Sequence, residues 1–219
     1  MGLLKHKTFV FNVFGENTYI AYTDNGDAAI IDPGCNNTAE CAELEGFIKA
    51  NQLNPVMLLN THAHIDHVLG NDFIYSKYGL LPRLHRNELV ILDALVYSST
   101  FYGVQATASP QPVDFLNEGD KLKLGGLEFE VIFAPGHSPG GLCFYFASEK
   151  VLFCGDVLFR ESIGRTDLPG GNFETLAHNI QTKLYTLPDD VEVYSGHGIP
   201  TTIGYEKKHN PFVGIKNEK

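Results

Sequence analysis

Four side chains that can bind a metal ion lie within seven consecutive positions of the sequence. Residues 61–67 read T-H-A-H-I-D-H and follow an apolar run. His62 and His64 are two positions apart, so in extended backbone both project to the same side of the chain. Asp66 and His67 should open the following helix, which turns them toward a neighbouring point. We therefore expect two groups of ligands side by side, and two groups indicate two metal ions.

Three more residues of the same chemistry stand at the ends of other expected strands. His137 lies in A-P-G-H-S-P-G-G, Asp156 in C-G-D-V, and His197 in S-G-H-G. Each has glycine beside or near it, which lets backbone approach closely. Open α/β sheets bind ligands at the carboxyl ends of their strands. We therefore expect these three side chains to join the first four at one site.

Taken alone, each of these residues has a plainer interpretation. A single polar residue beside glycine is usually part of a turn, and a single histidine is usually a packing or surface residue. We expect that plainer role for the histidines without matching partners, which are His6, His85, His178 and His209. Asp32 should fix a turn and support the ligands from behind. Cys154 is expected to be a small buried hydrophobic residue.

The elements that must position these side chains alternate between strands and helices. Strands are expected at 18–23, 28–31, 56–60, 121–124, 127–133, 142–147, 151–154 and 191–194. Helices are expected at 38–51, 66–77, 87–101 and 173–185, and a last amphipathic segment at 201–209. Both halves share the order strands, helix, strand, polar cluster. This order predicts one domain, 1–219, built of two similar halves as a four-layer αβ/βα sandwich.

Composition excludes several classes of protein. Of the 219 residues, 43% are hydrophobic, which is enough for a packed core. A formal net charge of −10 argues against nucleic acid or an anionic membrane as partner, so a small-molecule substrate is expected. No apolar run approaches the roughly 18 residues of a membrane span, and no secretory signal is visible. Four cysteines without metal-binding spacing then predict reduced thiols and a cytoplasmic location.

On these residues the chain resembles the metallo-β-lactamase-fold hydrolases. The resemblance extends from about residue 17 to the end of the chain, and its motifs are much more specific for the fold than for the substrate. It is carried by N-T-Y-I at 17–20, I-D-P-G at 31–34, T-H-A-H-I-D-H at 61–67, P-G-H-S-P-G-G around His137, G-D-V-L-F around Asp156 and G-H-G around His197.

The resemblance implies that the first metal is bound by His62, His64 and His137. It implies that the second metal is bound by Asp66, His67 and His197, and that Asp156 bridges the two. Two zinc ions about 3.5–4 Å apart would share a hydroxide whose pKa falls to roughly 7. That hydroxide would attack a carbonyl, and Asp66 would orient it and pass on its proton as the catalytic carboxylate. Because all ligands are His or Asp, iron or manganese can compete with zinc.

Within the fold, the chain looks most like glyoxalase II-type enzymes, which hydrolyse thioesters of acylated glutathione. Arg165, in G-R-T-D-L-P-G-G at 164–171, stands near where the larger enzymes have a lysine facing the glutathione carboxylate. Asp167 and Ile199 replace two tyrosines of those enzymes. They also have a C-terminal helical domain, for which the 22 residues after His197 (219 − 197) leave no room. The resemblance thus implies a thioesterase without identifying its thiol.

A second branch of the same fold gives the alternative prediction. Iron persulfide dioxygenases share the skeleton, including a G-R-T-D stretch, but bind one iron through residues corresponding to His62, His137 and Asp156. Such a triad leaves positions open for O₂. A nuclease is disfavoured by the acidic charge, and a secreted lactamase by the missing export signal. The acyl group, the native metal and the oligomeric state are not predicted by the sequence.

Overall fold

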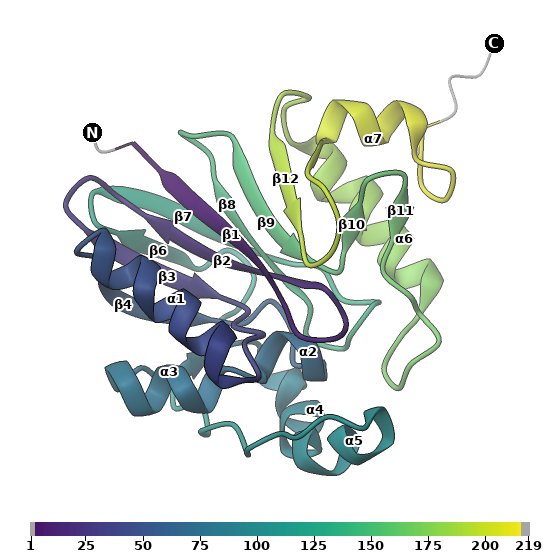
Figure 1. Ribbon diagram of the computed structural model, residues 1–219. Helices are drawn as coiled ribbons and strands as arrows, with labels where there is room; N and C mark the ends of the chain where they lie inside the picture. The colour runs from purple at the N-terminus through teal and green to yellow at the C-terminus, as the bar shows by residue number, and fades with distance from the viewer. Residues whose placement is uncertain (1–2, 216–219) are drawn as a thin grey trace.

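Two β-sheets form the centre of the protein in the computed structural model, which describes residues 3–215 (Figure 1). The first sheet has the order β1 (Lys5–Phe11), β2 (Glu16–Tyr22), β3 (Asp27–Ile31), β4 (Asn54–Leu59) and β5 (Pro82–Arg83). The second has the order β13 (Thr201–Thr202), β12 (Glu192–Ser195), β9 (Val151–Gly155), β8 (Leu142–Phe146), β7 (Leu127–Phe133) and β6 (Lys121–Leu124). A small hairpin joins β10 (Leu158–Phe159) and β11 (Ser162–Ile163).

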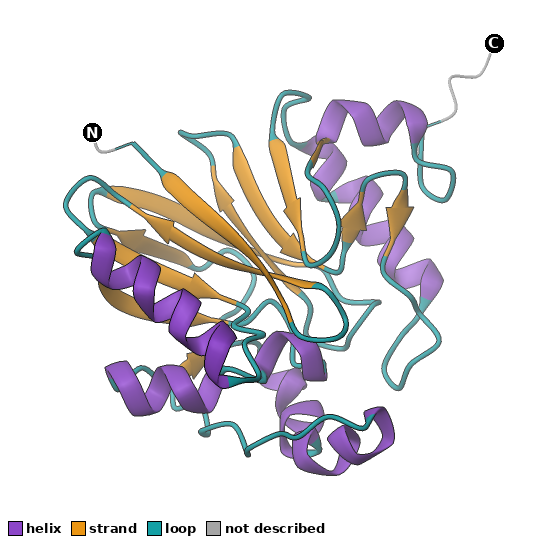
Figure 2. Ribbon diagram, in the orientation of Figure 1, coloured by secondary structure: helices purple, strands orange, loops and turns teal. Residues whose placement is uncertain are grey.

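Helices cover the outer faces of both sheets (Figure 2). The first sheet is covered by α1 (Thr38–Ala50) and α3 (Asn71–Tyr78), and the second by α6 (Phe173–Thr182) and α7 (Ile203–His209). Near one end of the sheets lie α2 (Ile65–Val68), η1 (Arg86–Glu88), α4 (Leu89–Asp93) and α5 (Leu95–Tyr102), while η2 (Leu184–Thr186) follows α6. The predicted four-layer αβ/βα sandwich is confirmed. Within residues 3–215, no helix combines the length and apolar character that a membrane crossing requires.

Strand alternation produces the layers. In β2, Ile20 points outward to a cluster that includes Leu44 of α1, whereas Tyr19 and Ala21 point inward between the sheets. There they meet side chains of the second sheet such as Phe144, which is fully buried. Successive side chains of a strand face opposite sides, so one apolar strand can contribute to two cores. Buried β-strands of this kind need nearly continuous apolar sequence.

Local sequence signals set the ends of α1 and the β2–β3 hairpin. The Asn37 side chain accepts hydrogen bonds from the backbone N–H groups of Ala39 and Glu40, both at 3.0 Å. Such a cap satisfies donors that the first helical turn leaves free. Between β2 and β3, Gly26 adopts a positive φ of 89°, which glycine tolerates without a Cβ clash. Asn37 thus fixes the start of α1, and Gly26 allows the turn between β2 and β3.

The single helix predicted at 66–77 is wrong, because the structure has α2 and α3 separated by Leu69 and Gly70. The N–H of Gly70 donates to the carbonyl of Pro33 at 2.7 Å. A Cβ at position 70 would lie 2.6 Å from Cys35 Sγ and 2.8 Å from Pro33 O. The chain bends here because a distant loop approaches its backbone, which no helical periodicity reveals.

The helix predicted at 87–101 is also divided, into η1, α4 and α5. Ala94 breaks the run between α4 and α5, with φ −81° and ψ 0°. The cap of η1 is His85, whose Nδ1 accepts from the N–H of Asn87. Strand β1 was not predicted, although K-H-K-T-F-V-F alternates in burial along its length.

Candidate metal centre

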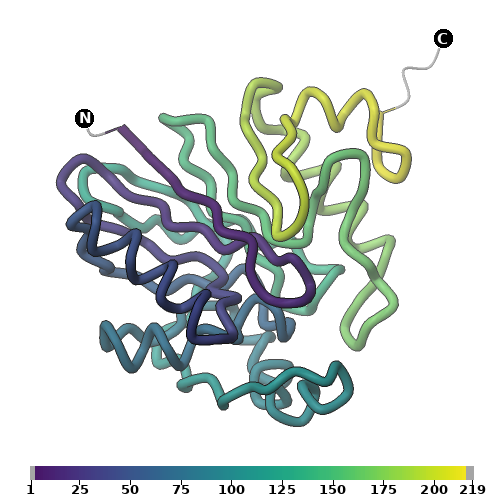
Figure 3. Tube along the Cα trace, viewed as in Figure 1, coloured from purple at the N-terminus to yellow at the C-terminus, as the bar shows by residue number. Residues whose placement is uncertain are grey.

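The seven predicted ligands converge at one end of the two sheets. They stand on four segments: the loop after β4 with the start of α2, the β7–β8 loop, and the ends of β9 and β12. The turn after β1 lies beside the loop after β12, as Figure 3 shows, and Asn17 N–H donates to Gly196 O at 2.7 Å. This contact brings the ends of both sheets to one place.

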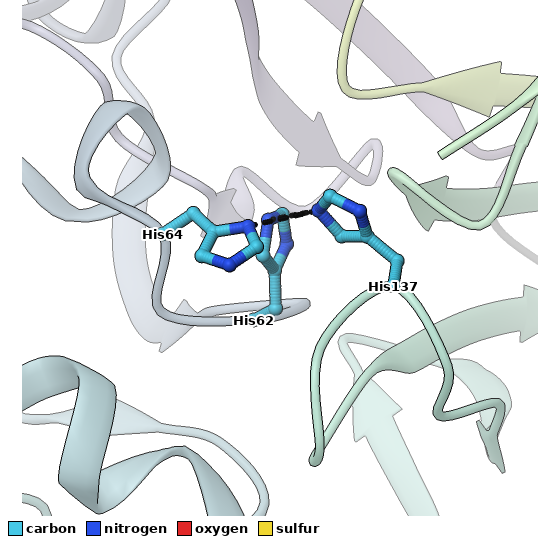
Figure 4. Close-up of side chains that lie close together, drawn as sticks. All are labelled: His62, His64 and His137. Carbon is cyan, nitrogen blue, oxygen red and sulfur yellow. Dashed lines mark hydrogen bonds between the residues drawn. The ribbon is translucent and has the colours of Figure 1, made fainter. Parts of the chain in front are cut away.

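The first group consists of three imidazoles from two loops. His64 Nδ1 lies 2.8 Å from His137 Nε2, which lies 3.2 Å from His62 Nε2. Figure 4 shows the three rings turned toward one another. Three imidazole nitrogens at this spacing cannot satisfy one another, because two neutral rings share at most one proton. A cation accepts all three lone pairs at once.

The second group combines one carboxylate and two imidazoles. Asp66 Oδ2 lies 3.0 Å from His197 Nε2 and 3.6 Å from His67 Nε2. Asp66 and His67 belong to α2, whereas His197 follows β12, 130 residues further along the chain (197 − 67). Mixed nitrogen and oxygen donors of this kind suit zinc, iron or manganese.

Asp156 lies between the two groups. Its Oδ2 is 3.5 Å from His137 Nε2 of the first group and 3.7 Å from His197 Nε2 of the second. Its Oδ1 is 3.4 Å from His67 Nε2. One carboxylate therefore faces both groups, which is the arrangement that a bridging ligand requires.

Four of the histidines have Nδ1 fixed from behind, which leaves Nε2 directed into the centre. His137 Nδ1 donates to Arg165 O at 2.7 Å, and His197 Nδ1 to Gly15 O at 3.2 Å. A carbonyl can only accept, so the proton of each neutral ring stands on Nδ1 and the Nε2 lone pair faces the centre. Such supporting contacts orient ligands and set their tautomers.

Asp32 supports the other two rings, as predicted. Its Oδ2 is 3.0 Å from His67 Nδ1, and its carboxylate also accepts from the N–H of Thr61 at 2.7 Å and from the Thr61 hydroxyl. The Thr61 oxygen is 3.1 Å from His62 Nδ1. Asp32 holds a left-handed backbone conformation, with φ 48°, which is uncommon for a residue with a Cβ.

The pKa values of the histidines divide the two groups. Burial lowers the pKa of His62 and His137, and burial with the neighbouring His137 lowers the pKa of His64 to about 3. Burial acts in the same direction on His67 and His197. There, however, the carboxylates of Asp66 and Asp156 raise the pKa of both rings. Protonation is therefore disfavoured in the first group and favoured in the second, beside its carboxylates.

Two buried atoms show that these residues fit a cation. His67 Nε2 and Asp156 Oδ1 have no hydrogen-bond partner within the described part of the chain. Such buried polar atoms are costly unless something satisfies them. Among residues 3–215, no Lys or Arg forms an ion pair with Asp66 or Asp156. A cation between the groups would meet the orphaned atoms and offset both carboxylates.

A cavity of about 470 Å³ opens over the centre, and Arg165 is among its lining residues. The Arg165 side chain is exposed and forms a bidentate pair with Asp167, with Nε 2.7 Å from Oδ1 and the terminal nitrogen 2.8 Å from Oδ2. This pair uses two of the five guanidinium N–H groups. The other N–H groups could contact a substrate. Substrate binding by Arg165 stays a prediction.

Sequence reasoning missed a buried carboxylate beside the centre, that of Glu88. It is fully buried and contacts the two loops that carry the first group. No sequence signal marks it, because its partners are mainly backbone groups. Two of the other histidines pack against aromatic rings, His6 on Tyr194 and His85 on Phe133, as expected for residues without ligand partners.

A family model described as the metallo-beta-lactamase superfamily matches residues 12–197. Hydroxyacylglutathione hydrolase GloC of Haemophilus influenzae is 39% identical over 206 residues, covering 93% of this chain and 95% of the relative. Probable metallo-hydrolase YqgX of Bacillus subtilis is 42% identical over 200 residues, covering 90% of this chain and 92% of the relative.

Solved structures show the same similarity over nearly the whole length. The B3 metallo-beta-lactamase BLEG-1 is 39% identical with a TM-score of 0.87, covering 95% of this chain and 99% of the other. The protein TTHA1623, solved in a di-iron-bound form, is 34% identical with a TM-score of 0.84, covering 94% of this chain and 99% of the other.

Proposed function

The chain belongs to the metallo-beta-lactamase superfamily, and on this premise we propose that it is a dinuclear metal-dependent thioesterase acting on S-acylglutathione-type substrates. One observation carries the proposal: Asp156 faces both ligand groups beneath a cavity bordered by a cationic side chain. The likeness to a hydroxyacylglutathione hydrolase supports the substrate class. A thiolate with a pKa near ~8.5 leaves more readily than an amine, so thioesters suit a site without an elaborate proton relay.

The residues divide the work in this proposal. One divalent cation would be held by His62, His64 and His137, and the other by Asp66, His67 and His197. Asp156 would be a ligand available to both. When bound, the two cations supply a Lewis acid for the carbonyl and an activated water at neutral pH. Asp66 orients that water and accepts its proton. Burial opposes its ionisation, but His67 keeps the pKa of Asp66 below its ordinary value, so the carboxylate stays ionised.

Zinc is the metal we propose, with iron or manganese as competitors. The site offers only nitrogen and oxygen donors, which all three metals accept. The similarity to a protein solved with two irons supports a dinuclear centre and favours testing iron first among the competitors. We also propose a cytoplasmic location, supported by four cysteines that are all free thiols in the structure.

The second group of ligands supports the dinuclear proposal over the mononuclear dioxygenase. That activity needs His62, His137 and Asp156, whereas Asp66, His67 and His197 also gather within 4.8 Å of one another. In a one-iron centre these three side chains would bind no metal ion. The dinuclear hydrolase is therefore the interpretation that uses all seven residues.

The test combines elemental analysis of the purified protein with three assays. We expect about two metal ions per chain and hydrolysis of S-lactoylglutathione. A β-lactam serves as the comparator substrate, because BLEG-1 is described as a B3 metallo-beta-lactamase. An oxygen electrode with glutathione persulfide tests the dioxygenase. One iron per chain with persulfide-dependent oxygen uptake and no thioester hydrolysis would overturn the proposal.

A further inference from the structure

The cavity over the metal centre has two chemically different walls. One wall comes from α4 and α5, and its residues are Val90, Ile91, Ala94, Leu95, Ser98 and Tyr102. The other comes from the loop between β11 and α6 and contains Arg165, Leu168 and Pro169. Figure 1 shows the two helices below the sheets and this loop to their right. One side of the cavity is thus largely apolar, and the other has a cationic residue.

Packing holds the apolar wall in place beside the ligands. Leu92 and Leu95 are buried and share a core cluster with Ile65 of α2, the helix that contains Asp66 and His67. At the far end of α5, the Tyr102 ring packs edge-on against Phe14, with centroids 5.5 Å apart. Because this wall is packed into a core, it is already ordered before a ligand binds. Binding therefore costs little conformational entropy on the protein side.

We propose that this wall binds the acyl group of the substrate, and that the preferred acyl groups are apolar chains or rings longer than lactoyl. The inference rests on the proposed thioesterase function. The reacting carbonyl must lie over the ligands, so its two substituents must extend in different directions. An anionic thiol is drawn toward Arg165, which leaves the acyl group beside α4 and α5.

The first test is a series of straight-chain acyl thioesters of glutathione, from acetyl through butanoyl to hexanoyl. Burial of each methylene should raise kcat/KM by about three- to fourfold until the wall is covered. An equal kcat/KM for all chain lengths would overturn the proposed acyl-binding role of the wall, while leaving the proposed thioesterase function intact. Failure to hydrolyse any member of the series would count against the proposed function itself.

The second test fills part of the cavity beside the apolar wall. Ala94 is half-buried between α4 and α5, so Ala94→Phe should fold and occupy the acyl side. We expect kcat/KM to fall about tenfold or more for the hexanoyl substrate and less than about threefold for the acetyl substrate. Val96→Phe is the matched control, because Val96 is exposed and lies outside the cavity lining. Equal losses on both substrates in Ala94→Phe, at unchanged metal content, would contradict the assignment.

A separate observation concerns Glu88, the last residue of η1. Its Oε2 accepts the N–H of Ala63 at 2.8 Å, and its Oε1 accepts the Ser138 hydroxyl and the Gly140 N–H. Ala63 stands between His62 and His64, and Ser138 follows His137. One buried carboxylate therefore joins the two loops that carry the first ligand group.

The structure assigns to Glu88 the role of a positioning residue that sets the spacing of the first ligand group. All three partners are donors, and only a carboxylate can accept from all of them. In Glu88→Gln, the amide nitrogen would face a buried N–H with no acceptor between them. The loops must then separate, although the side-chain volume is unchanged.

Zinc titration of the metal-free protein against a chromophoric chelator tests this role without relying on turnover. Supporting residues typically change metal affinity by roughly 10–100-fold, so we expect Glu88→Gln to weaken one of two zinc-binding steps by about tenfold or more. Glu130→Gln is the matched control, because Glu130 is exposed on β7. Unchanged affinity for both zinc ions, whatever the melting temperature, would overturn the role.

Two milder variants keep the test valid if Glu88→Gln fails to fold. Ser138→Ala removes one of the three donors and should weaken the same step by about threefold. Gly140→Ala keeps the carboxylate but displaces it, because a Cβ there would lie 2.7 Å from Glu88 Cγ and 2.8 Å from Oε1. Gly140→Ala should also weaken zinc binding to the first ligand group. Weaker zinc binding to the second group alone would contradict the assignment.

Discussion

Asp156 Oδ1 lies 3.4 Å from His67 Nε2, and neither buried atom has a hydrogen-bond partner in the range 3–215. The two atoms face each other at the boundary between the ligand groups. Without a cation, a proton on His67 is what balances the carboxylates of Asp66 and Asp156. A cation that binds the second group therefore competes with protons more strongly than a cation that binds the first group.

This competition predicts the order in which metal is lost on acidification. The carboxylates raise the pKa of His67 and His197, whereas burial lowers the pKa of His62, His64 and His137. A ring with a raised pKa takes up its proton at a higher pH as the pH falls. The second group should therefore release its cation first.

Elemental analysis after dialysis at a series of falling pH values checks this order. We expect the metal content to fall from two toward one per chain first, with the remaining ion lost only at lower pH. The His137→Ala variant identifies the sites, because it should leave almost no metal at the acidic end. Simultaneous loss of both ions from the unaltered protein would show that the two groups titrate alike.

Removing a first-group ligand should abolish most turnover. His137 contacts His62, His64 and Asp156, so His137→Ala opens the first group and leaves the second largely intact. We expect about one metal ion per chain and a loss of thioester hydrolysis of at least about 100-fold. His178→Ala, at an exposed position of α6, is the control and should retain both properties. Unchanged metal content in His137→Ala would remove it from the ligand set.

Arg165 should act on substrate charge and not on the metals. Its side chain is exposed and paired with Asp167, so Arg165→Ala should raise KM for an anionic thioester by only about two- to fivefold. A neutral ester should be nearly unaffected. The contact of His137 with the Arg165 carbonyl is preserved in the variant.

The matched control for this charge effect is Arg160→Ala. The Arg160 guanidinium lies over the Tyr205 ring, 4.3 Å from its centroid, and outside the cavity lining. Steady-state kinetics on both substrates should separate the two variants. The same KM change for anionic and neutral substrates in Arg165→Ala would mean that Arg165 does not recognise charge.

Two glycine substitutions should have opposite effects on stability. A Cβ at Gly164 would lie 1.9 Å from Asp156 O and 2.9 Å from the His137 ring, so Gly164→Ala forces the loop away from the centre. We expect a loss of about 1–3 kcal/mol in the free energy of unfolding. Gly46 lies within α1, and a Cβ there would meet no neighbouring atom within 4 Å, so Gly46→Ala should gain about 0.5–1 kcal/mol. Denaturant unfolding of both variants measures the difference, and a neutral Gly164→Ala would refute the close approach.

The layers and the ligand set could be predicted because the types and spacing of the residues indicate them directly. Strand alternation and apolar runs place Ile20 and Tyr19 on opposite faces, and the histidine spacing marks residues 61–67. The breaks at Gly70 and Ala94 could not be predicted in the same way. The first depends on a hydrogen bond to Pro33, from a loop that is distant in sequence.

The supporting contacts of the centre were the least predictable part. Glu88 resembles an ordinary acidic residue at the start of a helix, since two of its three partners are backbone N–H groups with no residue-type signature. Asp32 could be predicted, because it follows a strand and precedes Gly34. The pairing of Arg165 with Asp167 could not be predicted with certainty, because the only sequence signal for it is that the two residues are two positions apart.

An anomalous-difference map from a crystal of the metal-loaded protein tests the central claim most directly. We predict two peaks per chain, one among His62, His64 and His137, the other among Asp66, His67 and His197, with Asp156 beside both. A single peak, or peaks away from these seven side chains, would contradict a centre built for two cations.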